Sequence, residues 1–338
     1  MAPGPKRYED YEDHFRARPN RRGSRPRTKD RPRHEDAVPG RVVAVDRGRY
    51  TVLVGDRTVV AMRARELGRK SIVVGDEVEL VGDVAGSPDA LARMVRVAYR
   101  RSVLRRTADD TDLVERVIVA NADQLAIVTA CADPEPRPRM IDRCLVAAYD
   151  AGLDPLLLLT KADLRDPSDL LSGYEALGVP SVVTRRGDED TGRIDALDAV
   201  RAHLADRVTV LVGHSGVGKS TLVNALIPGT DRAVGVVNEV TGRGRHTSAS
   251  AVALALPGGG WVVDTPGVRS FGLAHVDVTK LLACFPDLEP GAQGCPRGCS
   301  HDEPECALDA YVASHAAGAY GAERLDSLRR LLRARADR

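Results

Sequence analysis

The chain has 338 residues, of which 43% are hydrophobic, and its formal net charge is only +1 at pH 7. This length suits two or three domains with cores of their own. No stretch approaches the roughly 18 apolar residues of a membrane helix, and the N-terminus lacks the apolar core of a signal peptide. We therefore expect a cytoplasmic protein that has no contact with a membrane.

Residues 1–37 are polar, are interrupted by prolines, and are dense in arginine from Arg16 to Arg33. Such a segment cannot bury enough apolar area to fold alone, so we expect a disordered basic arm. Two interpretations of the arm stay open. It is either a solvated tail or an arm that binds nucleic-acid phosphates.

Short runs of alternating apolar and polar residues follow, separated by Gly-Asp and Gly-Arg turns; they span 40–45, 50–54, 58–62, 76–80 and 91–97. Five small strands at this spacing predict a Greek-key barrel of the OB-fold type over residues 38–100. OB barrels that read nucleic-acid bases stack them on aromatic side chains, and here only Tyr50 and Tyr99 are available. Contacts to phosphates are favoured instead, because a basic run follows the last strand; its members are Arg100, Arg101, Arg105 and Arg106.

From about residue 101 the pattern indicates an α/β domain that continues to 273. Apolar, β-branched runs predict strands at 124–129, 155–160, 179–184, 207–212, 250–256 and 261–264. Helical periodicity predicts helices at 140–150, 168–177, 194–204 and 220–226. This alternation is typical of a mostly parallel sheet with helices on both faces.

The strongest motif is G-x-x-x-x-G-K-[ST] between the strand at 207–212 and the helix at 220–226. A strand, a glycine loop and a helix N-terminus form a cradle for phosphates. The Lys219 ammonium can reach the β- and γ-phosphates and the Ser220 hydroxyl can bind Mg²⁺. The nucleotide is expected to contact Gly213, His214, Ser215, Gly216, Val217, Gly218, Lys219, Ser220 and Thr221.

A second motif, Thr160, Lys161, Ala162 and Asp163, follows a buried strand. The Asp163 carboxylate can accept hydrogen bonds from N1–H and N2–H₂ of guanine, which adenine does not offer. The Lys161 stem can cover the base. Together with the glycine loop, this motif predicts a site for GTP and GDP, and it argues against an ATPase.

A third motif, Asp-Thr-Pro-Gly at 264–267, follows the strand at 261–264. Asp264 would hold Mg²⁺ through water, and the Gly267 amide would sense the γ-phosphate. The glycine-rich segment 241–248 is either a switch loop or a plain surface loop. Within it Thr247 is the candidate second Mg²⁺ hydroxyl, with Ser248 the alternative.

The order of these motifs is circularly permuted. In ordinary small GTPases the phosphate loop precedes the guanine motif, whereas here 160–163 precedes 213–220. The same sheet can be cut and rejoined elsewhere because chain termini often lie close together. The segment after Asp264 then leads directly into a C-terminal domain at 274–338.

That C-terminal domain contains the cluster Cys295, Cys299, His301 and Cys306. Three thiols and one imidazole within twelve residues suit one tetrahedral, structural Zn²⁺. A redox pair and three unrelated thiols stay open as alternatives. Residues 307–338 are expected to be helical and basic, with either a solvated face or a phosphate-binding one; the basic residues are Arg324, Arg329, Arg330, Arg333 and Arg335.

With these motifs in this order, the chain resembles the RsgA (YjeQ-type) family of circularly permuted GTPases from about residue 38 to the end. The resemblance implies GTP hydrolysis with Mg²⁺, binding to the small (30S) ribosomal subunit and its 16S rRNA, and a role late in subunit maturation, with hydrolysis coupled to release of the protein or of other factors. We expect a monomer. Thr160 stands where the family usually has asparagine, and Thr184 and Arg185 do not match its base-support motif.

Hydrolysis is expected to be slow without a partner, because Val268 stands where many GTPases have a water-orienting glutamine. His246 is the candidate catalytic substitute, since a neutral imidazole can orient water near pH 7. Alternatively His246 only packs or contacts rRNA. A passive RNA-binding assembly factor that holds GTP or GDP structurally is the competing function.

Overall fold

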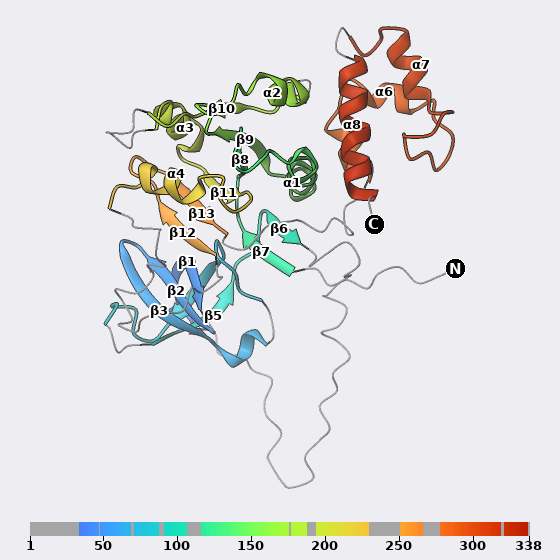
Figure 1. Cartoon of the computed structure of the whole chain (residues 1–338). Coiled ribbons are helices and arrows are strands. Elements are labelled where there is room, and N and C mark those ends of the chain that lie inside the picture. The colour runs from blue at the N-terminus through green and yellow to red at the C-terminus, as the bar shows by residue number, and fades with distance from the viewer. Residues whose placement is uncertain are drawn as a thin grey trace.

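The structure is a computed structural model of the chain (Figure 1), and it describes residues 34–46, 48–68, 71–87, 91–106, 116–175, 177–187, 194–229, 251–265, 278–318 and 321–336. The basic arm up to residue 33 lies outside these ranges. So do three candidate residues of the nucleotide site, His246, Thr247 and Gly267, together with the alternative Ser248 and with Val268.

The N-terminal strands form a closed five-stranded barrel in the order β1-β2-β3-β5-β4, which pairs back to β1. The strands are β1 (Val38–Asp46), β2 (Arg49–Val54), β3 (Arg57–Arg63), β4 (Glu77–Val81) and β5 (Ala92–Val97), with a short 3₁₀ turn at Arg65–Leu67. Alternate residues point inward, so that Val52, Leu80 and Met94 are fully buried. The OB-like barrel is thereby confirmed.

Two residues of the barrel, Tyr50 and Arg100, differ from the expectation for its surface. Tyr50 is only 8% exposed because it shares the inward face of β2 with Val52, so Tyr99, 95% exposed, is the one of the two aromatic residues that solvent reaches. The Arg100 guanidinium makes a two-pronged ion pair with the buried Asp76 carboxylate, at 2.6 and 2.8 Å. Arg100 therefore stabilises the barrel and is not available to RNA phosphates.

The α/β part is a six-stranded sheet in the order β10-β9-β8-β11-β13-β12, parallel except for β12. Its strands are β8 (Gln124–Ala130), β9 (Asp154–Thr160), β10 (Ser181–Val183), β11 (Val208–Val212), β12 (Val252–Ala255) and β13 (Trp261–Asp264). Its helices are α1 (Pro138–Ala151), α2 (Ser168–Glu175), α3 (Leu197–Leu204) and α4 (Lys219–Leu226). All ten elements agree with the predicted pattern.

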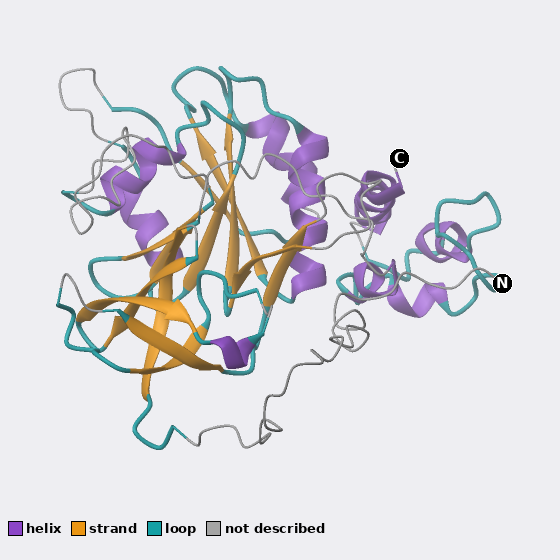
Figure 2. Ribbon diagram, turned by 90° about the horizontal axis from the view of Figure 1, so that it is seen from below, coloured by secondary structure: helices purple, strands orange, loops and turns teal. Residues whose placement is uncertain are grey.

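Each face of this sheet has its own core, because successive side chains of a strand point to opposite faces. On one face Ile127 and Leu157 pack with α1 and α2. On the other face Val128 and Leu158 pack with α3 and α4. Figure 2 shows the helices on both sides of the strands.

A two-stranded hairpin that the sequence pattern did not predict joins the barrel to the sheet; it consists of β6 (Val103–Arg106) and β7 (Arg116–Ala120). The junction is tight. Gly75 has φ +90°, and a β-carbon there would lie 1.9 Å from the Ala120 carbonyl oxygen. The Asn121 side-chain amide donates to the Gly75 carbonyl at 2.9 Å. A further connection pairs Ala44 of β1 with Val252 of β12, so the barrel and the sheet are continuous.

The C-terminal part contains α5 (Val278–Ala283), α6 (Glu289–Ala292), α7 (Ala307–Ala313) and α8 (Gly321–Ala336). The long helix expected at 307–338 is therefore two helices, separated by a bend at which His315 and Gly318 have positive φ. Helix α8 packs beside α1, and Phe285 and Leu328 lie in the same core as the first face of the sheet. The predicted domain limits at 37/38, 100/101 and 273/274 stay predictions.

Candidate nucleotide and metal sites

The three nucleotide motifs meet at one edge of the sheet. Thr160 is the last residue of β9, Gly213 follows β11, and Asp264 is the last residue of β13. Parallel strands place their carboxyl ends at the same edge, which is where α/β proteins bind ligands. The fold therefore brings the ends of these three strands to one edge of the sheet.

Backbone geometry explains the glycines of the phosphate loop. Gly213 has φ +155°, and a β-carbon there would lie 2.3 Å from the Val128 carbonyl oxygen. Gly216 and Gly218 have φ of +83° and +92°, where side chains are disfavoured. The Lys219 ammonium donates to the carbonyls of Gly213 and His214 and so lies along this loop. Ser215, Gly216, Ser220 and Thr221 are exposed to solvent.

Thr160 joins the guanine motif to the phosphate loop. Its buried hydroxyl is 2.6 Å from the Val217 carbonyl oxygen and 3.3 Å from that of Thr129. One hydroxyl hydrogen serves one strong acceptor at a time, so the shorter contact to Val217 dominates. The threonine that stands in place of the usual asparagine thus still makes a side-chain contact to the loop.

The remaining residues of the guanine motif, Lys161 to Asp163, follow β9 directly, and each makes a hydrogen bond to a neighbouring segment. Lys161 has φ +57°, and its ammonium donates to the Asp133 carbonyl in the loop before α1. Ala162 N–H donates to the Thr184 carbonyl at 3.2 Å. The exposed Asp163 carboxylate accepts the backbone N–H of Arg186 at 3.0 Å, which fixes its direction.

Sequence reasoning missed the supporting role of two of these residues. Thr184 donates its hydroxyl to the Leu159 carbonyl at 3.0 Å, and so it holds the end of β10 against β9. Asp133 holds Lys161. Strand adjacency at the carboxyl edge is a signal that could have pointed to Thr184, whereas no sequence pattern brings Asp133 next to Lys161.

Asp264 lies beside the phosphate loop because β13 pairs in parallel with β11, with Asp264 opposite Leu211. The next residue, Thr265, is 3% exposed and donates its hydroxyl to the Leu211 carbonyl at 3.0 Å. This bond fixes the chain direction just after Asp264. It also explains a threonine at this position, which sequence reasoning left without a role.

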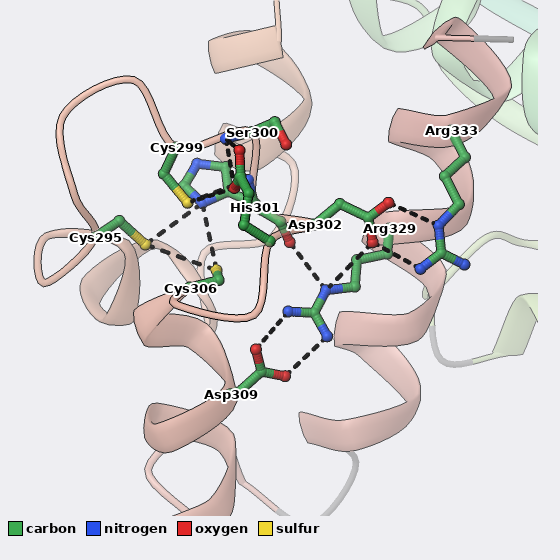
Figure 3. Close-up of polar contacts among 10 residues, drawn as sticks. Cys295, Cys299, Ser300, His301, Asp302, Cys306, Asp309, Arg329 and Arg333 are labelled. Atoms are coloured by element: carbon green, nitrogen blue, oxygen red, sulfur yellow. Dashed lines mark hydrogen bonds and ion pairs between the residues drawn. The ribbon is translucent and has the colours of Figure 1, made fainter.

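The four predicted metal ligands come together in the C-terminal part (Figure 3), with all ligand atoms within 4.8 Å of one another. The Sγ atoms of Cys295 and Cys306 are 3.8 Å apart, and they lie 3.5 and 3.9 Å from His301 Nδ1. A tetrahedral zinc site with ordinary bond lengths requires edges of about 3.8 Å between sulfurs and about 3.6 Å from sulfur to nitrogen. The residues therefore fit a zinc ion.

The protonation chemistry of the cluster also suits a cation. Burial raises the pKa of Cys299 to about 12, so its thiol stays protonated near neutrality unless a metal displaces the proton. Burial lowers the pKa of His301, which favours the neutral imidazole that a metal binds. Glu303 accepts the Ser300 backbone N–H at 2.9 Å and the Cys299 thiol at 3.1 Å, and these bonds lower the pKa of Glu303 to about 2.

Three basic residues of α8, Arg324, Arg329 and Arg330, are at most 31% exposed, whereas the side chain of Arg333 is 58% exposed. Arg335 aside, whose side chain lies outside the description, each of the predicted set is in an ion pair with an aspartate. The partners of Arg324, Arg329, Arg330 and Arg333 are Asp287, Asp309, Asp142 and Asp302.

The fold and the motif order define a circularly permuted P-loop GTPase with an N-terminal barrel. The sequence model of the RsgA GTPase family matches residues 97–274. A protein of Pseudomonas aeruginosa (strain LESB58) named small ribosomal subunit biogenesis GTPase RsgA is 42% identical over 246 residues, covering 70% of this chain and 69% of that protein. The protein of the same name from Gemmatimonas aurantiaca is 37% identical over 263 residues, covering 75% and 83%. The chain belongs to the RsgA GTPase family, whose members are GTP hydrolases.

Two solved structures share the fold. The crystal structure of YjeQ from Thermotoga maritima superposes with a TM-score of 0.63 at 26% identity, covering 89% of this chain and 99% of that one. YloQ, described as a circularly permuted GTPase, gives a TM-score of 0.62 at 23% identity, covering 91% and 98%. None of the helices in the described ranges has the length and apolar composition that a membrane span requires.

Proposed function

We propose that this chain hydrolyses GTP with Mg²⁺ and acts in the late maturation of the small ribosomal subunit, where it binds 16S rRNA. The observation that carries the GTP part is the direct contact of Thr160 with Val217, which unites the guanine motif and the phosphate loop in one site. The ribosomal part is supported by the printed names of the relatives.

In this proposal each motif has one chemical task. The glycine loop and the N-terminus of α4 bind the phosphates, and Lys219 moves from the loop carbonyls to the phosphate oxygens. Asp163 accepts hydrogen bonds from guanine while its other contact, to the Arg186 amide, keeps it in place. Ser220, Thr247 and Asp264 would hold Mg²⁺, which neutralises charge on the transferring phosphate, and the Gly267 amide would meet the γ-phosphate.

Slow hydrolysis in isolation is part of the same proposal. Val268 cannot polarise water, and His246 is the candidate that would orient it when the small subunit is bound. Hydrolysis then releases the protein or another factor from the subunit, because GTP and GDP favour different conformations of the same site.

In this proposal the C-terminal part binds one structural Zn²⁺ through Cys295, Cys299, His301 and Cys306. Their interatomic distances support this assignment. We further propose that the protein works as a monomer in the cytoplasm, where assembling subunits are found. The competing function, a passive RNA-binding factor, requires equal binding to the subunit in the GTP and GDP states.

The test is GTP turnover with and without purified small subunits. We expect stimulation by subunits, no turnover for Lys219→Ala, and loss of the stimulation for His246→Ala. His203→Ala changes an exposed histidine on α3 and is the matched control. Normal stimulation of His246→Ala rejects its catalytic role. Equal affinity of subunits for the GTP-bound and GDP-bound protein favours the passive function, and competition by ATP argues against guanine selection by Asp163.

A further inference from the structure

Arg329 of α8 contacts the segment that carries the metal ligands. Its Nε donates to the His301 carbonyl at 2.9 Å, and its two terminal nitrogens donate to the Asp309 carboxylate at 2.8 and 2.7 Å (Figure 3). One planar guanidinium thus joins the ligand loop to the start of α7. The Arg329 side chain is only 18% exposed, which limits its competing contacts with water.

Arg333 lies one helical turn further along and holds the next residue of the same loop. Its guanidinium makes a two-pronged ion pair with Asp302, at 2.8 and 2.6 Å. Residues four apart on a helix share a face, so Arg329 and Arg333 bind the consecutive loop residues His301 and Asp302 from the same side. His301 has φ +68°, a conformation that non-glycine residues disfavour, and these contacts help to hold it there.

Arg330 is adjacent to Arg329 in sequence but contacts helices α1 and α2 of the α/β part. Its Nε lies 3.0 Å from Asp142 of α1, whose side chain is 1% exposed. The same guanidinium lies over the Tyr174 ring of α2, 4.9 Å from the centroid. This ion pair and the contact with the Tyr174 ring tie α8 to α1 and α2.

We propose that Arg329 and Arg333 are positioning residues for the zinc ligands and that Arg330 anchors their helix to the GTPase domain, so that zinc affinity depends on the docking of α8 onto α1. The inference rests on the proposed zinc site. Outer contacts orient metal ligands, and their loss typically costs 10–100-fold in metal affinity. Because such coupling is reciprocal, bound zinc in turn stabilises the docking of α8.

The first experiment measures zinc affinity of the full chain by competition with a chromogenic chelator. We expect Arg329→Gln to weaken zinc binding by about 10–100-fold and Arg329→Lys to weaken it less, because lysine can still reach the His301 carbonyl but not both Asp309 oxygens. Glu323→Gln, at an exposed site of α8, is the matched control. The Co²⁺-substituted protein should show a shifted ligand-field spectrum in Arg329→Gln. Zinc affinity and a spectrum equal to those of the control overturn the positioning role.

The second experiment follows hydrogen exchange with and without zinc. In the unaltered chain, zinc removal should speed exchange in α8 and in α1 as well as in the ligand loop. In Arg330→Met, and less so in Arg330→Lys, α1 should no longer respond to zinc. Protection of β8 and β11 in every variant shows that the sheet is folded.

The outcomes separate the two proposals. A chain that binds no zinc overturns the metal site and this inference together. A chain that binds zinc, but in which zinc removal alters exchange only within 295–306, overturns this inference and leaves the metal site intact.

Discussion

The replacement Thr160→Val tests whether the guanine motif acts on the phosphate loop through a single hydroxyl. Valine has nearly the shape of threonine but no donor, and Thr160 is only 7% exposed, so the change deletes one hydrogen bond at a site that stays packed. The Val217 carbonyl loses the donor that lies 2.6 Å away. The phosphate loop is then held less rigidly in its binding conformation, and nucleotide should bind more weakly.

The expected magnitude follows from leaving a buried acceptor without its donor, which costs about 1–3 kcal/mol. At 1.4 kcal/mol per tenfold change, an upper bound on the loss of GDP affinity is roughly 5–150-fold. Thr160→Ser keeps the donor and should lose much less. GDP affinity is measured by competition with a fluorescent guanine nucleotide.

Thr209→Val is the matched control, because it deletes the same kind of bond away from the nucleotide. Thr209 is fully buried in β11 and its hydroxyl lies 3.0 Å from Gln124 Oε1. Both valine variants should lower the thermal midpoint, but only Thr160→Val should weaken GDP binding. Equal GDP affinity in the two variants would refute the argument that Thr160 acts on the loop.

Three further predictions concern the junction, the base and the metal. Gly75→Ala should lower the free energy of unfolding by about 3 kcal/mol or more, because the added β-carbon would lie 1.9 Å from the Ala120 carbonyl oxygen. Gly55→Ala is the control: Gly55 has φ +57° and open space around it, so this change should cost only about 1–2 kcal/mol. Equal shifts of the thermal midpoint in the two variants contradict this prediction. Asp163→Asn should weaken GTP and improve xanthosine triphosphate in competition binding, since an amide can donate to the 2-oxo group of xanthine; unchanged preference argues against base recognition by this residue. Cys306→Ser should lower zinc content per chain and make the ligand loop as sensitive to protease as chelator makes the unaltered chain, and undiminished zinc content removes this thiol from the ligand set.

Strands, helices and clustered motif residues could be predicted from the sequence, but contacts between residues far apart in the sequence could not. The strands of the barrel and the sheet follow from alternating or β-branched runs, and the metal ligands lie within twelve residues of one another. The inward direction of Tyr50 was also available, because alternation along β2 places it on the same face as Val52. By contrast, β6 buries only Leu104 and carries two arginines, so its strand character depends on its partner β7.

The arginines show why charge runs are hard to interpret. Arg100 pairs with Asp76, 24 residues earlier, and Arg330 pairs with Asp142 on a distant helix. A basic run in sequence suggests an RNA surface, but the acidic partners become neighbours only after folding. Because Asp76 and Asp142 are buried, the arginines that pair with them stabilise the fold and do not form an RNA-binding surface.

The permuted order gives the barrel a place next to the nucleotide site. Strand β12 follows the segment with the candidate switch residues, pairs antiparallel with β13, and has Val252 opposite Asp264. On its other side the same residue, Val252, pairs with Ala44 of the barrel strand β1. One residue of β12 thus borders both the candidate Mg²⁺ carboxylate and the barrel. A shift of β12 with nucleotide would therefore reach the barrel through Ala44. The contacts of Gly75 with Ala120 and Asn121 hold the other side of the junction, so such a shift would tilt the barrel about that tight contact.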